Sequence, residues 1–548
     1  MPEFETGGRR SGAWLRAATA VASGILMAFS LPLVMPVMTS GEPLLGPWSE
    51  SLALFGLVPL LWHLRGAAPK RAFWLGTLAG LVYFMLCLSW LNVAMTIFGH
   101  LPQIASLPIL GLLSGFLALF WGAAFWVAVR IEKRLGFPVC LGLPLCWVGF
   151  EFLRNYVLTG FPWAAIGTTQ ARSLWLAQLA SLGGVYLVAF VVVLTNTTLE
   201  SLLAWVRHRA PLAARTVAGW AVLMALASIF ASLRLQDGAQ PDGTRIRVAI
   251  VQGNLDERTY LRGGSAQRRV LARMLRQSVL ARRAGAVLAV WPEGTLPAPL
   301  SPLTKSLANL APRLPAGEPL PREMIIGGIT RGYRDGKLLL TNSAFLVDSD
   351  LHIEARYDKR HLVPFGEYVP LASILPYQWF VPPGIAFFSP GPNHLPLDAR
   401  AGKLGMMICY EAIFPEIARV AVNGGARLLV NITNDSWYGE SSAPHQHLAQ
   451  SRMRAIETGR YLVRSANTGV SAIIDPYGRI VGRIPLGLSR SAGDRIGFGD
   501  LEPPMMLTKT VALIDGKTIY TTIGDLFAWL CSALVLGLLG WSFARKNS

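Results

Sequence analysis

The chain has 548 residues, of which 52% are hydrophobic and only 15% are charged, against about 25% charged residues in an ordinary soluble domain. This composition excludes a wholly soluble protein and indicates a membrane protein with more than one domain. The formal net charge of +18 would be compatible with binding to a nucleic acid. However, no basic run is interleaved with aromatic residues, and much of the excess lies between apolar segments. We therefore expect no nucleic-acid binding.

Eight apolar segments are predicted to cross a bilayer, which takes about 20 residues each. They occupy residues 14–38, 52–64, 72–97, 104–129, 138–157, 174–205, 215–233 and 523–543. The second of these segments is short, and the sixth is long enough to begin as a helix at the membrane surface.

Lys and Arg gather in every second loop between these segments and at both chain ends. Because basic residues mark the cytoplasmic side, both termini are expected in the cytoplasm of a bacterium. The sequence predicts a multi-pass protein of the inner membrane in three parts: a membrane domain of about seven helices (1–233), a periplasmic catalytic domain (234–522), and a last helix with a cytoplasmic tail (523–548).

From residue 245 the pattern changes to short apolar runs that alternate with helical stretches. Strands are expected at 246–252, 286–291, 324–330, 342–347, 353–357, 404–409, 428–433, 461–466, 470–474 and 479–484, and helices at 265–284, 301–311, 413–422 and 446–458. This alternation indicates an α/β layered domain. Since the strands are nearly continuous apolar runs, the sheets should be covered on both faces.

Cys409 is the only cysteine between residues 234 and 522, so it has no disulfide partner in its own domain. The other four cysteines lie in the apolar membrane-type runs: Cys87, Cys140, Cys146 and Cys531. An unpaired thiol is either a buried core residue or a reagent. Glu293 and Lys359 favour the second interpretation, because cysteine, carboxylate and ammonium together supply a nucleophile, its base and an oxyanion partner. All three follow the C-terminal ends of expected strands, where ligands of α/β folds gather.

Each of these residues also has a purely structural interpretation. Cys409 would be a buried small hydrophobe, Glu293 a charge at a helix N-terminus, and Lys359 a solvated surface charge. His445 and His447 are spaced as metal ligands can be, but no cysteine or carboxylate cluster accompanies them, so no metal site is predicted. No phosphate-binding or dinucleotide-binding glycine loop is present, and no cofactor is expected.

The segment 364–393 is rich in proline and aromatic residues and has no clear period. A long loop of this kind in a compact domain is usually functional. Its apolar side chains suit a bilayer surface better than water. We expect a lid that touches lipid, and the alternative is a buried packing loop.

Three motifs together resemble the nitrilase, or carbon–nitrogen hydrolase, superfamily. They are Trp-Pro-Glu ending at Glu293, Tyr-x-Lys-x-x-Leu-Val-Pro-Phe-Gly-Glu at 357–367, and Ile-Cys-Tyr-Glu at 408–411. Three further features narrow the resemblance from the superfamily to one family. They are the spans on either side, the membrane-edge segment 152–163 and the Thr-Asn-Asp-Ser-Trp-Tyr-Gly motif at 433–439. Over nearly its whole length the chain resembles the apolipoprotein N-acyltransferase family.

The resemblance implies a nitrilase-like αββα sandwich for the soluble domain and a polytopic α-helical membrane domain. It implies catalytic roles for Glu293, Lys359 and Cys409, a second essential carboxylate at Glu367, and supporting roles for Tyr410 and Glu411. The tryptophan that the family usually carries shortly after Val-Gln-Gly is absent, and Tyr260 stands in that region. Substrate contacts are expected from Trp163, Tyr260, Trp379, Phe380, Asn434 and Trp437.

The activity implied by the resemblance is acyl transfer from a membrane phospholipid, through a thioester on Cys409. The acceptor is the free α-amine of the S-diacylglyceryl cysteine of a diacylated apolipoprotein, the last step of bacterial lipoprotein maturation. A monomer working against the lipid bilayer is expected.

Two other functions compete with acyl transfer. A membrane-tethered amidase or nitrilase would use the same three residues and release the acyl group to water; the Phe161-Pro162-Trp163 segment and the apolar lid favour transfer. A transporter with an appended binding domain would need ionisable residues inside its spans. Only Glu151 and Arg154 come near a span, and they lie at its end.

Overall fold

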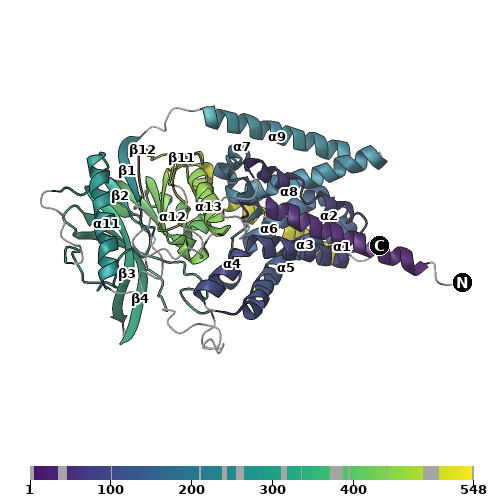
Figure 1. Cartoon of the computed structure of the whole chain (residues 1–548). Helices are drawn as coiled ribbons and strands as arrows, with labels where there is room; N and C mark the ends of the chain where they lie inside the picture. Colours follow the sequence, from purple (N-terminus) through teal and green to yellow (C-terminus); the bar gives the residue numbers. More distant parts are fainter. Residues whose placement is uncertain are drawn as a thin grey trace.

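The computed structural model describes residues 5–34, 46–99, 101–208, 212–236, 243–254, 264–309, 318–334, 336–370, 387–392, 395–439, 441–484 and 505–545. Within these ranges a bundle of helices lies beside a part built from two β-sheets (Figure 1). The longer helices of the bundle are α1 (Glu5–Phe29), α3 (Pro69–Cys87), α5 (Gln103–Leu135), α6 (Val139–Leu153), α8 (Ala180–His208), α9 (Leu212–Gln236) and α15 (Leu526–Ala544). Shorter helices include α2 (Val58–Trp62), α4 (Trp90–Val93), α7 (Leu174–Ala177) and α14 (Ile519–Ile523).

Five helices among the described residues are long and apolar enough to cross a membrane: α1, α5, α8, α9 and α15. A sixth span results if α3 and the segment Trp90–Ile97, which are bent by 48° at their junction, are counted together. The two other segments expected to span correspond to shorter apolar helices, Trp48–Trp62 and Val139–Leu153. The 15 residues of α6 extend about 22 Å, less than the bilayer core of about 30 Å. Eight spans therefore stays a prediction.

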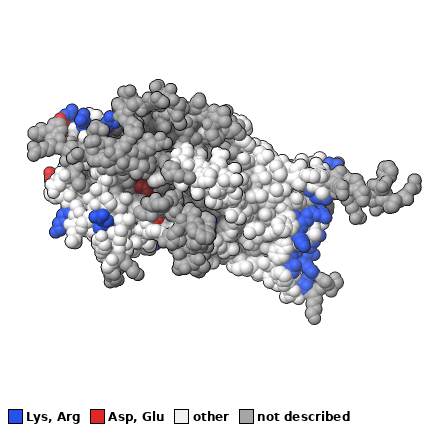
Figure 2. Space-filling view, turned by 60° about the horizontal axis from the view of Figure 1, so that its bottom comes forward, with Lys and Arg blue, Asp and Glu red and all other residues white. Residues whose placement is uncertain are grey.

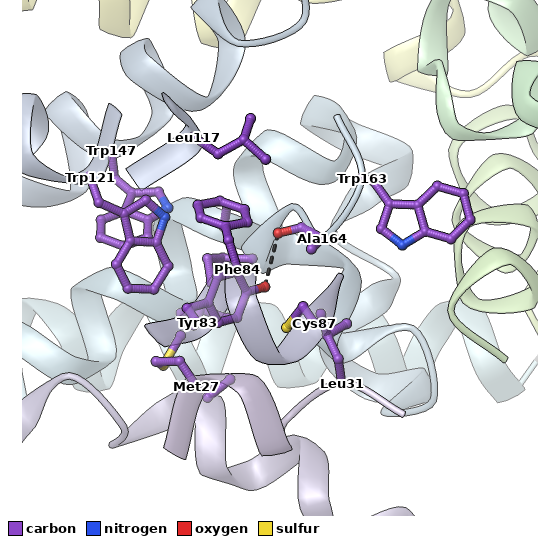
Figure 3. Close-up of a cluster of buried hydrophobic side chains, with 14 of the residues drawn as sticks. Met27, Leu31, Tyr83, Phe84, Cys87, Leu117, Trp121, Trp147, Trp163 and Ala164 are labelled. Carbon is purple, nitrogen blue, oxygen red and sulfur yellow. Dashed lines mark hydrogen bonds between the residues drawn. The ribbon is translucent and has the colours of Figure 1, made fainter. Parts of the chain in front are cut away.

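Aromatic side chains hold the centre of the bundle together (Figure 3). Tyr83 of α3 stacks on Trp121 of α5 with ring centroids 4.8 Å apart, and Trp121 lies 4.6 Å from Trp147 of α6. The Tyr83 hydroxyl donates to the Ala164 carbonyl at 2.9 Å. Because a buried hydroxyl needs a partner, this bond fixes the segment around Ala164 against the bundle. Trp163, its neighbour, lies at the edge of the cluster (Figure 3).

Basic side chains gather at the end of the bundle that lies away from the sheets (Figure 2). Lys133, at the end of α5, donates to the Gly66 carbonyl in the α2–α3 loop at 3.2 Å. Arg545, after α15, donates to the Arg134 carbonyl at 3.3 Å. Three of the basic segments singled out in the sequence therefore meet at one end of the molecule.

Within the ranges given above, each of the two sheets has six strands. The first runs in the order β12-β1-β2-β3-β4-β5 and the second in the order β11-β10-β9-β8-β7-β6. The strands are β1 (Thr244–Gln252), β2 (Leu288–Val290), β3 (Glu323–Arg334), β4 (Lys337–Asp348), β5 (Ile353–Asp358), β6 (Leu397–Ala399), β7 (Gly402–Ile408), β8 (Leu428–Thr433), β9 (Leu462–Ala466), β10 (Ser471–Ile474), β11 (Ile480–Ile484) and β12 (Met505–Leu513). In each sheet three neighbouring strands are parallel, β1-β2-β3 and β7-β8-β9.

Alternate residues of the strands face opposite layers, as the period of two demands. Val248 and Ile250 of β1 pack against the second sheet in one core, whereas Ala249 and Val251 pack against α11 (Gly264–Arg283) in another. The outer face of the second sheet is covered by α12 (Pro415–Asn423) and α13 (Ala443–Thr458), which lie between it and the helical bundle (Figure 1). The result is the expected αββα sandwich, covered on both faces.

One expected helix and two strands differ from the sequence-based expectation. The helix expected at 301–311 is wrong for the described residues up to 309, which follow the sheet edge instead. The Leu300 amide donates to the Ile329 carbonyl at 2.8 Å, and the Leu307 amide to the Leu351 carbonyl at 2.8 Å. Backbone bonds to the sheet thus replace those of a helix, and Pro302 lacks the amide that a helix would use. The strands β6 and β12 were not anticipated; β12 pairs antiparallel with β1, a partner far away in the sequence.

Candidate active site

Three strand ends bring Glu293, Lys359 and Cys409 together. Glu293 follows β2 and Lys359 follows β5 in the first sheet, and Cys409 follows β7 in the second. The Lys359 ammonium nitrogen lies 3.6 Å from Glu293 Oε1, and the charges of Glu293 and Lys359 both act on the pKa of the buried Cys409 thiol. The three residues therefore lie together at the C-terminal ends of their strands, as expected.

Glu293 is buried, and both of its carboxylate oxygens are held. Oε1 accepts from Asn342 Nδ2 at 2.7 Å, and Oε2 accepts from the backbone amide of Asn434 at 2.9 Å. Burial raises the pKa of Glu293 above its ordinary value, with Lys359 acting against the shift and Glu367 adding to it. A raised pKa moves the carboxylate toward the range in which a general base works best.

Lys359 is 1% exposed, so the solvated surface charge considered from the sequence is wrong. Its ammonium group donates to Glu367 Oε1 at 2.8 Å. Burial alone would lower the pKa of Lys359, but the negative charges of Glu367 and Glu293 outweigh it and raise that pKa above its ordinary value. The group is therefore a permanent cation inside the site.

Glu367 and Asn342 complete the arrangement around the two charged groups. Glu367 Oε2 accepts from the Val363 amide at 2.8 Å, and its Oε1 accepts from Asn342 Nδ2 at 3.1 Å. One amide group of Asn342 thus serves both carboxylates. Sequence reasoning missed this residue. An asparagine inside the apolar strand β4 could have indicated it, because a buried amide needs a hydrogen-bond partner.

Cys409 occupies the first position of a short 3₁₀ turn that follows β7, Cys409–Ile413. Its φ of 51° lies in the left-handed region, which is unfavourable for any residue except glycine. Burial and the charge of Glu293 raise the pKa of the Cys409 thiol to about 12. The resting residue is therefore a thiol, and it needs a base at the moment it reacts.

Glu411 fastens the Cys409 strand to the Lys359 strand. This fully buried carboxylate accepts from the Ile408 amide at 2.7 Å, the Arg360 amide at 2.7 Å and the Tyr357 hydroxyl at 3.0 Å. Ile408 precedes Cys409 and Arg360 follows Lys359. The Glu411 side chain therefore fixes the position of the backbone at Cys409 relative to the backbone at Lys359.

Tyr410 connects the site to the helical bundle. Its hydroxyl donates to the Gly160 carbonyl at 3.4 Å, and its ring lies 6.4 Å from that of Phe161. The membrane-edge segment picked out in the sequence therefore forms one wall beside Cys409.

The residues expected to contact substrate differ in their surroundings. Trp163 is fully buried, and its indole Nε1 donates to Gln446 Oε1 of α13 at 2.7 Å. Asn434 lies at the site through its bond to Glu293, whereas Trp437 is 43% exposed. Tyr260, Trp379 and Phe380 lie outside the described residues. Contact of any of them with substrate stays a prediction.

The described ends of the segment 364–393 attach to the backbone of the site. The Phe388 amide donates to the Glu367 carbonyl at 2.8 Å, and the Gly391 amide donates to the Lys359 carbonyl at 2.8 Å. Phe365 and Phe387 are each about half exposed. Residues 371–386 lie outside the described residues, so the lid stays a prediction.

Comparison with known proteins matches both parts of the chain. The carbon–nitrogen hydrolase family matches residues 247–487, and the apolipoprotein N-acyltransferase N-terminal domain matches residues 14–198. An apolipoprotein N-acyltransferase of Geobacter metallireducens is 36% identical, with 100% of this chain and 98% of that protein covered. One of Azotobacter vinelandii is 32% identical over 96% of each chain, and one of Chromobacterium violaceum is 33% identical over 90% of each.

The fold and the site define a membrane-bound enzyme whose catalytic part is a carbon–nitrogen hydrolase domain. The chain belongs to the apolipoprotein N-acyltransferase family. It is an N-acyltransferase, and the resemblance inferred from the sequence motifs is confirmed.

Proposed function

We propose that the protein transfers a fatty acyl chain from a membrane phospholipid to the N-terminal amine of the S-diacylglyceryl cysteine of an apolipoprotein, through a thioester on Cys409. The observation that carries the proposal is the buried contact of Glu293 with the Lys359 ammonium, whose charges act on the Cys409 thiol. This contact lies against a wall formed by the helical bundle, so both lipid-anchored substrates have the same route from the bilayer.

In the first step Glu293 takes the thiol proton as the Cys409 sulfur attacks the ester carbonyl of the donor. A thiol with a pKa of about 12 is not ionised beforehand, so the proton and the new carbon–sulfur bond must move together. Lys359 faces the oxyanion that develops, because it stays charged and fixed in place. The ester carbon–oxygen bond then breaks, and Glu293 returns the proton to the departing lysophospholipid.

In the second step the α-amine of the apolipoprotein attacks the thioester carbonyl. Glu293 accepts a proton from the amine and passes it to the Cys409 sulfur as the carbon–sulfur bond breaks, so Cys409 leaves as a thiol and Glu293 is again a carboxylate. The amide product carries the acyl chain. Burial of all three side chains keeps bulk water from the thioester, which favours transfer over hydrolysis.

The basic end of the bundle (Figure 2) supports a cytoplasmic position for that end, because Lys and Arg mark the inner side of a membrane. The sheets lie at the other end and are periplasmic, where exported lipoproteins are reached. In this arrangement residues 1–233 and 523–548 anchor the catalytic residues 234–522. All the reacting side chains come from one chain, so a monomer suffices.

Intact-mass analysis of the purified protein tests the proposal. After incubation with phospholipid, the chain should gain the mass of one acyl group, and hydroxylamine should remove it. Cys409→Ala should gain nothing, whereas Cys146→Ala, a change of a buried cysteine in the bundle, should gain the same mass as the parent chain. Absence of the adduct from the parent chain, or an adduct on another cysteine, would contradict the thioester.

A diacylated lipopeptide distinguishes transfer from hydrolysis. Its addition should discharge the adduct quickly and add the acyl mass to the lipopeptide. Discharge at the same rate in buffer alone, with the mass recovered as free fatty acid, would make the protein a hydrolase.

A further inference from the structure

A buried polar array lies directly behind Cys409. His447 of α13 places its Nε2 3.0 Å from the carbonyl oxygen of Cys409, and its Nδ1 lies 3.2 Å from Asp435 Oδ1. Arg464 Nη2 lies 2.7 Å from Asp435 Oδ2 and 3.1 Å from His447 Nδ1. The side chains of these three residues are fully buried.

The hydrogen-bond partners of the His447 ring show which of its two nitrogens carries the proton. A carbonyl oxygen can only accept, so Nε2 of His447 carries a proton and donates to Cys409. Burial and the Arg464 charge lower the pKa of His447, which makes the ring neutral and leaves Nδ1 as an acceptor for Arg464. Asp435 remains ionised, since despite burial the Arg464 charge lowers its pKa, and its Oδ2 accepts from the same Arg464 nitrogen that donates to Nδ1.

Cys409 needs a partner of this kind because of its backbone. A left-handed conformation of a residue other than glycine is strained and persists only where the surroundings hold it. The Ile408 amide is held by Glu411 on one side of Cys409, and the Cys409 carbonyl is held by His447 on the other. The peptide units on both sides of the nucleophile are thus fastened.

We propose that His447, held in place by Asp435 and Arg464, is a positioning residue that keeps Cys409 in the left-handed conformation from which its thiol reaches Glu293. The inference rests on the proposed role of Cys409 as the nucleophile. The ring of Trp163, from the membrane-edge segment, lies 5.5 Å from the His447 ring, so the helical bundle packs against the same array.

Three substitutions of one residue test the inference. His447→Gln keeps an amide donor near the position of Nε2, His447→Asn has a donor too short to reach the Cys409 carbonyl, and His447→Leu has none. Thr458→Val is the matched control, because Thr458 is a buried residue of the same helix whose hydroxyl bonds only within that helix in the described structure. The measured quantities are the single-turnover rate of acyl-adduct formation at several phospholipid concentrations and the thermal unfolding temperature.

We expect the rate at saturating phospholipid to fall about 10- to 100-fold in His447→Leu and His447→Asn, as displacement of a reacting atom by about 1 Å does. The half-saturating phospholipid concentration should not change. His447→Gln should stay within about fivefold of the parent chain, and Thr458→Val should match it.

Equal rates in the Gln and Asn variants, whether both fast or both slow, would overturn the inference, and that comparison stands even if His447→Leu does not fold. A loss of rate that follows the loss of unfolding temperature across all four variants would also overturn it, because the array would then be structural only. Failure of the proposed function looks different: the parent chain itself would form no adduct on Cys409.

Discussion

Replacing Asn342 with alanine removes a neutral donor that two carboxylates share. Asn342 Nδ2 lies 2.7 Å from Glu293 Oε1 and 3.1 Å from Glu367 Oε1. The bond to Glu293 favours the ionised form of that carboxylate. Of the other groups that act on Glu293, Lys359 and the Asn434 amide also favour the ionised form, and Glu367 opposes it.

The magnitude follows from the bond that is lost. A hydrogen bond to a charged group contributes about 1.5–3 kcal/mol, and the lower end applies because one donor is divided between two acceptors. About 1.4 kcal/mol corresponds to one pKa unit. The ionised form of Glu293 should therefore lose about 1.5 kcal/mol of stabilisation in Asn342→Ala, and the pKa of Glu293, already raised by burial, should rise further.

The consequence appears on the acid side of the rate profile. Glu293 works as a base when ionised, so the rate of acyl-adduct formation is full above its pKa and falls as the pH drops through it. Because that pKa rises in Asn342→Ala, the fall should begin at higher pH. The assay is the adduct-formation rate from about pH 5 to about pH 9, followed by intact mass.

Asn423→Ala is the matched control, since Asn423 donates to the Thr521 carbonyl at 3.0 Å, away from the three reacting side chains. Its acid limb should coincide with that of the parent chain. An unmoved acid limb in Asn342→Ala, or a shift to lower pH, would refute the reasoning about the shared donor.

The remaining predictions concern the nucleophile, its anchor, the membrane topology and the lid. Cys409→Ser should abolish transfer in a folded protein, because an alkoxide forms far less readily than a thiolate, whereas each of the four other cysteines should tolerate alanine; transfer by Cys409→Ala would end the proposal. Glu411→Gln should lower the free energy of unfolding by about 2–4 kcal/mol, since the charged acceptor of several buried donors is lost; an unchanged denaturation midpoint would disprove its anchoring role. A reporter active only in the periplasm should work when fused after Leu235 and fail after Ser548, and the opposite result would invert the topology. Trp379→Ser should slow turnover of lipid-anchored substrates more than the reaction of the thiol with a small soluble reagent, and equal losses would make the loop structural support.

Sequence reasoning could single out the candidate residues because their signals are local. Glu293, Lys359 and Cys409 each lie at or just past the end of an expected strand and within a short motif. Ligands of α/β folds gather at the C-terminal ends of strands, and this led to the expectation that the three residues meet. The strand pattern predicted an α/β layered domain with both sheet faces covered, and the resemblance to the nitrilase superfamily implied the αββα sandwich.

Contacts between distant elements were not accessible in this way. The pairing of β12 with β1 joins the end of the catalytic part to its beginning. A local sequence pattern cannot predict which distant strand pairs with β1. The segment 301–309 has helix-compatible residues, yet backbone bonds to β3 and to the β4–β5 turn take the place of helical ones. Tertiary pairing outweighed local propensity there.

By itself the sequence determined the layered fold and an apolar bundle with a basic end, and it predicted which side chains carry the chemistry. Only the tertiary structure decided that Lys359 is buried between two carboxylates, that Asn342 serves both of them, and that His447 holds the carbonyl of Cys409. The physical reason is the distance along the chain over which each signal acts. Periodicity and strand ends are properties of a few consecutive residues, whereas a hydrogen bond or an ion pair between two sheets depends on the register of both sheets and on the packing that removes water between them.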